Sequence, residues 1–382
     1  MNRRRLSAEP HAPKYRQVFE HLSADILSGK YKPGQKFPSE AALVQQFKTS
    51  RITIGHALRE LVQRGLVERV AGSGTYVRQA RRRESAGVFG LLIPDLGATE
   101  IFDPICRGIA AAPRAVPHTL LWGTVASGQT TRELQALRLC DQFVRRGVSG
   151  VFFAPVERAA QAREINLEIL SRLEKARIAV VLLDREVLPY PQRGRYDLVG
   201  IDNRRAAYLA TEHLLKLGSS SLSFLACSGS AATVEARAAG FREAIGASGL
   251  PADAGQVVLV EDITAETVRP LLTKKRQRAF VCANDRTAGR LMHVLQALAY
   301  RVPQDVRIVG IDDVEYASLL PVPLTTVHQP CREIGEAAMA AMLDRMERPG
   351  MPAKDILLDC HLVVRRSCGA RRVAPGARRA RS

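Results

Sequence analysis

The chain has 382 residues, which is enough for two or three domains with a core each. Its net charge of +18 lies at the two ends: residues 1–83 carry +11, residues 365–382 carry +7, and residues 84–364 are neutral. An alternative explanation of the charge is a genome whose codons favour arginine, but that bias would spread arginine over the whole chain. The asymmetry therefore favours a segment that binds a polyanion, attached to a neutral body.

The seven cysteines are scattered, and none are spaced as Cys-x-x-Cys, which argues against a disulfide framework or a metal site. A signal peptide requires an apolar run after its basic start, and this sequence has none there. The longest apolar stretches, such as Ile178–Leu183, are too short to span a bilayer. Phosphate-binding loops and nucleophile motifs are also missing. We therefore expect a cytoplasmic protein that is not an enzyme and has no catalytic residue, cofactor or metal.

Three short helices and a hairpin are predicted after a disordered arm at residues 1–13. Apolar residues at three- and four-residue spacing predict the first helix over residues 14–28. Ser39 is the expected N-cap of the second helix and Ser50 that of the third. The Gly-Ser-Gly sequence at 72–74 then predicts the turn of a β-hairpin.

The third predicted helix has two chemically different faces. One face is apolar and includes Ile54, Leu58 and Leu61, so we expect it to pack on the other two helices. The opposite face can enter a DNA major groove. It carries Arg51, Ile52, His56 and Arg59. The hydroxyl groups of Ser39 and Ser50 lie at helix N-termini, where DNA phosphates bind.

The stretch at residues 34–77 resembles the winged helix-turn-helix head of the GntR family of bacterial repressors. The matching motifs are Pro-Ser-Glu at 38–40, Ser-Arg-x-Thr at 50–53 and Gly-x-Gly-Thr-x-Val at 72–77. The resemblance implies a DNA-binding domain over residues 14–78. It also implies DNA contacts from Ser50, Arg51 and Thr53, with Gly72 at the tip of the wing.

Beyond a charged linker at residues 79–85, short apolar runs alternate with helical segments. This alternation predicts parallel sheets with crossover helices over residues 86–366. Nine expected strands exceed one sheet of ordinary width, so we expect two lobes. Residues 367–382 are rich in arginine, alanine and glycine, and they are expected to form a disordered basic tail.

Several predicted strands end in side chains that suit a carbohydrate, and the carboxyl ends of parallel strands are where ligands bind. Carboxylates, guanidinium groups and amides make paired hydrogen bonds to sugar hydroxyls, and an aromatic ring covers the C–H face of the sugar. The candidates are Asp95, Phe102, Asp184, Arg185, Arg237, Asn284, Asp285, Asp312 and Gln329. A structural role stays open for two of them: Asp312 could cap a helix, and Arg237 could form a salt bridge between the lobes.

Residues 86–365 resemble the effector domain of the lactose and galactose repressors, which shares its fold with periplasmic sugar-binding proteins. The matching stretches include "VFGLLIPD", "VGIDNRRAAYLATEHLLKLG" and "VPQDVRIVGIDD". The resemblance implies an α/β fold with a winged helix-turn-helix head and a two-lobed periplasmic-binding-protein-like domain. It also implies ligand contacts at Arg185, Arg237, Asp285 and Asp312.

The two resemblances together predict a DNA-binding transcriptional repressor. A small-molecule effector, most simply a sugar, would bind between the lobes and control the head. The expected partners are operator DNA, the carbohydrate effector and a second copy of the chain in a homodimer, with no membrane. The alternative is a solute-binding protein that has no role on DNA.

Overall fold

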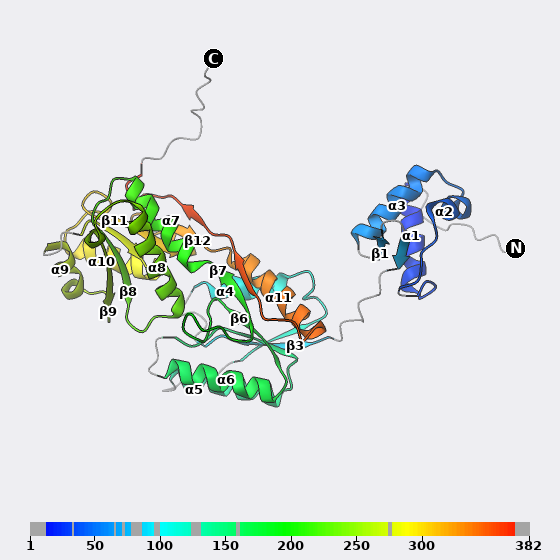
Figure 1. The fold of residues 1–382 in the computed structure, drawn as a ribbon, viewed down its shortest axis with the longest axis horizontal. Helices are drawn as coiled ribbons and strands as arrows, with labels where there is room; N and C mark the ends of the chain where they lie inside the picture. Colours follow the sequence, from blue (N-terminus) through cyan, green and yellow to red (C-terminus); the bar gives the residue numbers. More distant parts are fainter. Residues whose placement is uncertain are drawn as a thin grey trace, which may run out of the picture. The chain divides into compact units, whose positions relative to one another are not determined.

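The computed structural model describes residues 13–32, 34–64, 66–70, 73–77, 86–94, 100–123, 131–157, 161–273 and 277–370. The chain divides into two compact units, residues 1–85 and 86–382, called here the head and the body (Figure 1). The predicted linker, all but the last residue of the predicted arm, and residues 371–382 of the predicted tail lie outside the described ranges. Within those ranges no helix has the length and apolarity needed to cross a membrane.

The head contains three helices followed by a two-stranded antiparallel hairpin. The helices are α1 (Lys14–Leu27), α2 (Glu40–Phe47) and α3 (Arg51–Gln63), and the strands are β1 (Val67–Val70) and β2 (Gly74–Val77). Leu22, Leu43, Ile54 and Leu61 are fully buried where the three helices meet, so the head has its own hydrophobic core. The predicted order of helices and hairpin is confirmed.

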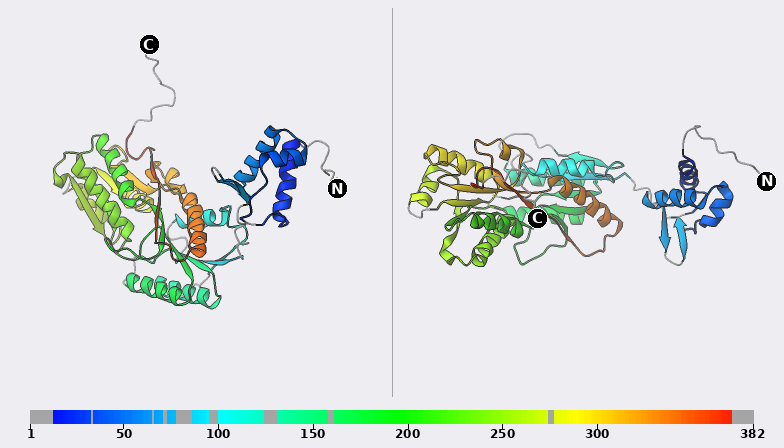
Figure 2. Two further views of the ribbon diagram at one scale, coloured as in Figure 1. Left: turned by 45° about the vertical axis from the view of Figure 1, so that its right-hand side comes forward. Right: turned by 90° about the horizontal axis from the view of Figure 1, so that it is seen from above.

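The first lobe of the body is built on a parallel sheet of six strands in the order β13-β7-β6-β5-β3-β4. Its strands are β3 (Val88–Leu92), β4 (Thr119–Trp122), β5 (Gly150–Phe153), β6 (Ala179–Leu183), β7 (Asp197–Ile201) and β13 (Asp355–Leu358). Its helices are α4 (Phe102–Ala111), α5 (Arg132–Arg145), α6 (Ala162–Lys175) and α11 (Cys331–Glu347). Helices α5 and α6 lie side by side on one face of the sheet, and α4 packs against α11 on the other (Figures 1 and 2).

The second lobe repeats this plan with strand order β14-β12-β11-β10-β8-β9, in which only β14 runs antiparallel to its neighbour. Its strands are β8 (Leu222–Cys227), β9 (Gly255–Val260), β10 (Ala279–Cys282), β11 (Arg307–Asp312), β12 (Thr325–His328) and β14 (His361–Val363). Its helices are α7 (Asn203–Lys216), α8 (Ala232–Ala247), α9 (Ala265–Thr273) and α10 (Asp285–Ala297). Helices α7 and α8 pack together, and α9 and α10 pack together near the opposite face of the sheet (Figure 1).

The chain passes between the two lobes three times. It passes from the first lobe to the second between β7 and α7 and returns to the first between β12 and α11. It passes to the second lobe again between β13 and β14. Each lobe is therefore assembled from segments far apart in the sequence. Three short crossing segments leave the lobes free to hinge about them, as two-lobed binding domains do.

Helices α4 and α11 approach each other closely at two glycines. A Cβ atom on Gly335 would lie 2.1 Å from the carbonyl oxygen of Ile105, and one on Gly108 would lie 2.0 Å from that of Arg332. Any side chain at these positions would overlap the backbone of the partner helix. The two glycines thus set the separation of the helices that cover one face of the first lobe.

The body extends further than the sequence indicates. Ser367 and Cys368, expected in the disordered tail, are fully buried. The Ser367 hydroxyl donates to the Ile308 carbonyl at 2.6 Å and accepts from the Thr325 amide at 2.8 Å, which fastens the chain to two strands of the second lobe. The sequence does not indicate this burial, because Ser367 and Cys368 are small residues that follow Arg365 and Arg366.

Candidate functional sites

Helix α3 presents one apolar face to the core of the head and one polar face to solvent. Ala57, Leu58 and Leu61 are buried, whereas Arg51, Ile52 and Arg59 are exposed. The apolar Ile52 side chain lies on the solvent side of this helix and is 83% exposed. Its predicted contact with DNA therefore requires no rearrangement of the head.

The predicted caps lie at the N-termini of α2 and α3. The Ser39 hydroxyl accepts from the amide of Ala42, and the Ser50 hydroxyl accepts from the amide of Thr53, each at 3.2 Å. The Ser50 and Thr53 hydroxyl oxygens are also 2.9 Å apart. These polar groups are exposed at helix N-termini, where backbone amides and the helix dipole attract phosphate.

Two further predicted DNA contacts have different surroundings. The His56 ring is exposed, but it packs edge-on against Tyr15 of α1 with the ring centres 4.1 Å apart, so its position is fixed. Gly72, predicted at the wing tip, lies outside the described residues. At the base of the wing, Arg69 on β1 pairs with Glu40 at the start of α2 at 2.6 Å, which ties the hairpin to the helices.

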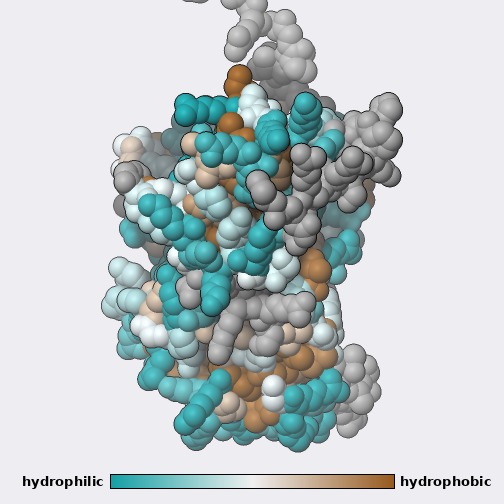
Figure 3. Space-filling model, turned by 90° about the vertical axis from the view of Figure 1, so that its right-hand side faces the viewer, coloured by the Kyte–Doolittle hydropathy of each residue, from teal (hydrophilic) through white to brown (hydrophobic). Residues whose placement is uncertain are grey.

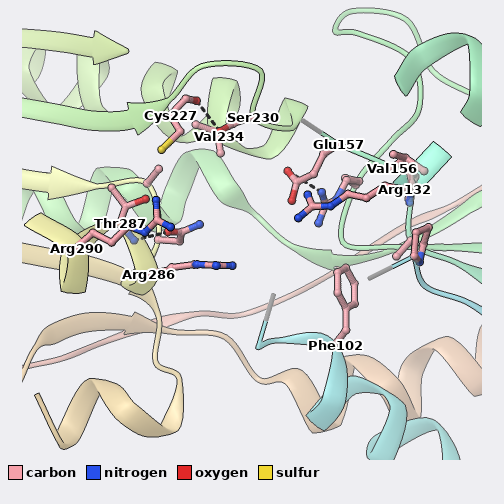
Figure 4. A pocket seen from close by; sticks show the side chains of 16 residues that line it. Phe102, Arg132, Val156, Glu157, Cys227, Ser230, Val234, Arg286, Thr287 and Arg290 are labelled. Atoms are coloured by element: carbon pink, nitrogen blue, oxygen red, sulfur yellow. Dashed lines mark hydrogen bonds and ion pairs between the residues drawn. The ribbon is translucent and has the colours of Figure 1, made fainter. Parts of the chain in front are cut away.

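In the body, a pocket with a cavity volume of about 90 Å³, partly open to solvent, lies between the carboxyl ends of the two sheets. From the first lobe it is lined by Pro94, Phe102, Arg132, Ala154, Pro155, Val156, Glu157 and Arg185, and from the second by Cys227, Ser230, Val234, Ala283, Asn284, Arg286, Thr287 and Arg290. Figure 4 shows Arg286 and Arg290 on one side of this space and Arg132 and Glu157 on the other. We call it the interlobe pocket.

Arg185, which is buried, and Glu157, which is partly exposed, form an ion pair on the first-lobe side of the interlobe pocket. The Arg185 guanidinium lies 2.8 Å from Glu157 and 3.1 Å from Asp184, and its central carbon lies 5.6 Å from the centre of the Phe102 ring. Burial alone would lower the pKa of Arg185, but the two carboxylates raise it. Glu157 also accepts from the backbone amide of Ala231 at the start of α8, so this cluster connects the two lobes.

A second polar cluster centres on Arg237, which is only 4% exposed. Its guanidinium donates to Asn203 at 2.7 Å, to the Ala283 carbonyl at 2.5 Å and to Asp312 at 3.4 Å. Asp312 also accepts from the side-chain amide of Gln329 at 2.6 Å. The structure thus brings together three of the predicted effector contacts, at two of the crossings between the lobes.

Two buried oxygen atoms beside these clusters have no hydrogen-bond partner in the described part of the chain. They are Oδ1 of Asp184 and Oε1 of Gln329. A buried acceptor without a partner costs free energy unless a ligand or water supplies a donor. Hydroxyl groups of a bound sugar would supply such donors.

Asp285 and Asn284 have roles that the sequence did not indicate. Asp285 does not line the interlobe pocket: its carboxylate accepts from the Thr326 hydroxyl at 2.6 Å and from the Val314 amide at 3.1 Å, within the second lobe. Burial raises the pKa of Asp285 to about 6, against the effect of these hydrogen bonds. Asn284 does line the pocket, and its side-chain oxygen also caps α10 by accepting from Thr287 at 2.9 Å.

The remaining predicted positions are divided between the pocket and the undescribed residues. Phe102 lines the pocket as predicted, whereas Asp95 lies outside the described residues. Sequence reasoning missed Glu157, Asn203 and the arginines Arg132, Arg286 and Arg290. Arg132 and Arg286 lie in the first turn of a helix and Arg290 in the next, where charged residues usually face solvent, so nothing in the sequence distinguished them.

The ionisation of Asp312 gives a testable pH dependence. Burial raises the pKa of Asp312 to about 8, although Arg237 opposes the shift. An unfolded aspartate titrates at about 3.9, so between these values the folded chain holds a proton that the unfolded chain has lost. The free energy of unfolding should therefore fall as the pH rises from about 5 to about 8.5. Chemical denaturation of Asp312→Asn, which cannot titrate, should show a smaller fall, whereas the exposed Asp253→Asn should follow the wild type.

Comparisons with known proteins agree with this division into head and body. Residues 14–77 match the model for bacterial regulatory proteins of the gntR family, and residues 211–368 match that for the periplasmic binding protein-like domain. The chain joins a GntR-family DNA-binding domain to a periplasmic binding protein-like domain. Among described residues no group of histidine, cysteine and acidic side chains could hold a metal ion.

Known proteins that are similar to this chain include transcriptional regulators. An arabinose metabolism transcriptional repressor of Geobacillus stearothermophilus is 28% identical over 94% of this chain and 98% of its own length. A LacI family regulator of Enterococcus faecium, solved with ribose, has a TM-score of 0.59 and 23% identity, covering 73% of this chain and 98% of its own. The regulator CelR, solved with cellobiose, has a TM-score of 0.60 and 22% identity over 93% of this chain and all of its own.

Proposed function

We propose that the GntR-family head binds an operator and that a carbohydrate held in the interlobe pocket controls this binding, most simply as the inducer of a repressor. The observation that carries the proposal is the joining of a head that matches the gntR family to a two-lobed body with a pocket between its lobes. The name of a relative supports it, because a protein similar to this chain over 94% of its residues is named an arabinose metabolism transcriptional repressor.

Two features support control of the head by the body. Glu157 already connects Arg185 of the first lobe to α8 of the second, so a ligand at this point would contact both lobes. A ligand shifts the balance between open and closed lobes only by its difference in affinity for the two. The proposal therefore requires that the ligand contacts both lobes. Phe102 lines the pocket from the first lobe and Asn284 lines it from the second.

We further propose that the chain acts as a homodimer on a palindromic operator. One α3 helix reads only a few base pairs, and two-fold symmetry doubles the contact. The described part of the body also exposes large apolar side chains, among them Val116 (88%) and Leu319 (75%), and Figure 3 shows an apolar area on the lower part of one face of the molecule. Sedimentation of the full chain at micromolar concentration should give the mass of a dimer; a monomer with and without DNA would contradict this part.

The DNA-binding part is tested by fluorescence anisotropy with the full chain and DNA from the region upstream of its own gene. Affinity should fall steeply with salt, because phosphate contacts release counterions. Arg51→Ala should weaken operator binding by about 1–3 kcal/mol, the value of a contact made by a recognition helix. Arg348→Ala, which removes the same charge from the body, should leave affinity almost unchanged.

The alternative function predicts a different pair of results. A solute-binding protein would bind a sugar in calorimetry and show no salt-dependent DNA binding at low ionic strength. That outcome would overturn the proposed function while leaving the interlobe site in place.

A further inference from the structure

Helix α3 has a glycine on the side that it presents to solvent. Gly55 is the fifth of the 13 residues of this helix. Arg51 lies one turn before it, Arg59 lies one turn after it, and Ile52 lies beside it, and all three of these side chains are exposed. The surface between them is a notch whose floor is the backbone of α3. We call it the glycine notch.

The fold of the head does not require glycine at position 55. The residue has no positive φ, so its backbone conformation is one that any residue adopts in a helix. Among the described residues, the nearest side-chain atom to a Cβ atom placed there would be a guanidinium nitrogen of Arg59, at 3.9 Å, which is an ordinary contact. Alanine would therefore fit at this position without any movement of the head.

Glycine nevertheless weakens the helix in which it lies. In a helix interior it lowers the helix-forming equilibrium about 2- to 5-fold relative to alanine. Neither the backbone conformation of Gly55 nor its packing in the described head offsets this loss. The use of an empty position on α3 is therefore to be found in what the exposed face contacts.

The glycine notch can make only apolar contacts at its floor. The N–H and C=O groups of Gly55 belong to the backbone hydrogen bonds inside α3, so they are not available to a base. The floor is then a Cα atom, with the apolar Ile52 side chain beside it. A polar base edge placed there would lose its water without gaining a hydrogen bond. The thymine methyl group is the apolar group that base pairs present in the major groove.

We propose that Gly55 determines operator specificity, because its missing side chain leaves room for the methyl group of a thymine next to Ile52. This rests on the proposed function, since it requires α3 to be the helix that reads the operator. A side chain at position 55 would hold α3 away from that base pair. The contacts predicted for Arg51 and Ile52 would then weaken as well.

The test measures binding of the full chain, by fluorescence anisotropy, to two forms of the DNA upstream of its own gene. One form contains thymine, and the other contains uracil in its place, which keeps every hydrogen-bonding group and removes only the methyl group. The wild type should bind the thymine form at least about 5-fold more tightly, since one base pair that is read contributes a factor of this size.

Gly55→Ala places a methyl group where the thymine methyl group would lie. On thymine DNA this variant should bind at least about 5-fold more weakly than the wild type, because two methyl groups would compete for one space. On uracil DNA that space is empty, so the alanine side chain is accommodated. The ratio of the two affinities should therefore fall at least about 5-fold from the wild type to the variant. Ile52 is the same in both proteins, so the difference isolates position 55.

Hydrogen exchange in the full chain separates a lost DNA contact from damage to the head. Alanine forms helix better than glycine, so the amides of α3 should exchange about 2- to 5-fold more slowly in Gly55→Ala. Gly246→Ala in α8 is the matched control, because it also adds a methyl group to a helix at a position where no described atom lies within 4 Å. It should change neither the affinity for DNA nor the preference for thymine.

The outcomes separate this inference from the proposed function. Wild-type affinity of Gly55→Ala for thymine DNA, or an unchanged preference for thymine, overturns the inference and leaves the proposed function in place. Weaker binding together with faster exchange in α3 also overturns it, because the fold itself would then require Gly55. A wild-type chain that shows no salt-dependent binding to either DNA contradicts the proposed function, on which the inference rests.

Discussion

Arg237→Ala is expected to abolish effector binding and to destabilise the body. The guanidinium is buried and donates to Asn203, Ala283 and Asp312, so its removal takes a donor away from three acceptors. A buried acceptor that is left unsatisfied costs about 1–3 kcal/mol. Chemical denaturation measures the loss of stability, and calorimetry with a set of simple sugars measures the loss of binding.

A second substitution distinguishes instability from loss of the site. Above about pH 8, where Asp312 is ionised, Arg237→Ala leaves its charge unpaired, and adding Asp312→Asn removes that charge, so part of the lost stability should return. Effector binding should not return, because the guanidinium that donates toward the crossings between the lobes is still missing. A double variant that regains both would show that Arg237 acts only through the stability of the fold.

Gly335→Ala is expected to destabilise the first lobe, although alanine normally favours a helix. The new Cβ atom would lie 2.1 Å from the Ile105 carbonyl oxygen and 2.6 Å from the Ile109 nitrogen, so α4 and α11 must move apart. Overpacking of this kind costs about 1–3 kcal/mol and occasionally more. The measurement is the midpoint of denaturant unfolding of the full chain.

Gly246→Ala in α8 is the matched control for this substitution. No atom lies within 4 Å of a Cβ atom at that position, so alanine adds helix propensity without a clash. It should raise stability by about 0.5–1 kcal/mol. Similar effects of the two substitutions would contradict the close approach of α4 and α11.

The parts of the fold that depend on local sequence were predictable. Ser39 and Ser50 cap α2 and α3 because each hydroxyl reaches an amide three residues ahead, an interaction readable from the sequence alone. The strands β12, β13 and β14 were not expected as strands. Each has only three or four residues, and β13 and β14 pair with strands more than 30 residues away in the chain.

The candidate site was predictable by residue type and less so by orientation. Arg237 and Asp312 meet near the crossings, and Arg185 lies at the interlobe pocket. Arg185 and Asp312 could be placed because they lie at the carboxyl ends of strands. Asp285 has the same chemistry, but Thr326 and Val314, which are 41 and 29 residues away in the chain, hold its carboxylate inside the second lobe. Contacts of this range cannot be read from one sequence without the fold.

The three crossings between the lobes also determine the order in which the body can form during synthesis. The head has a complete core by residue 77 and can fold soon after it leaves the ribosome. The first lobe cannot complete its fold until α11 and β13 have been synthesised, near residue 358. Helix α4 therefore lacks its partner α11 while most of the second lobe is synthesised. A chain that ends prematurely before residue 331 would therefore keep a folded DNA-binding head on an incomplete sensor. Late nonsense mutations in this gene should uncouple operator binding from the effector instead of only removing the protein.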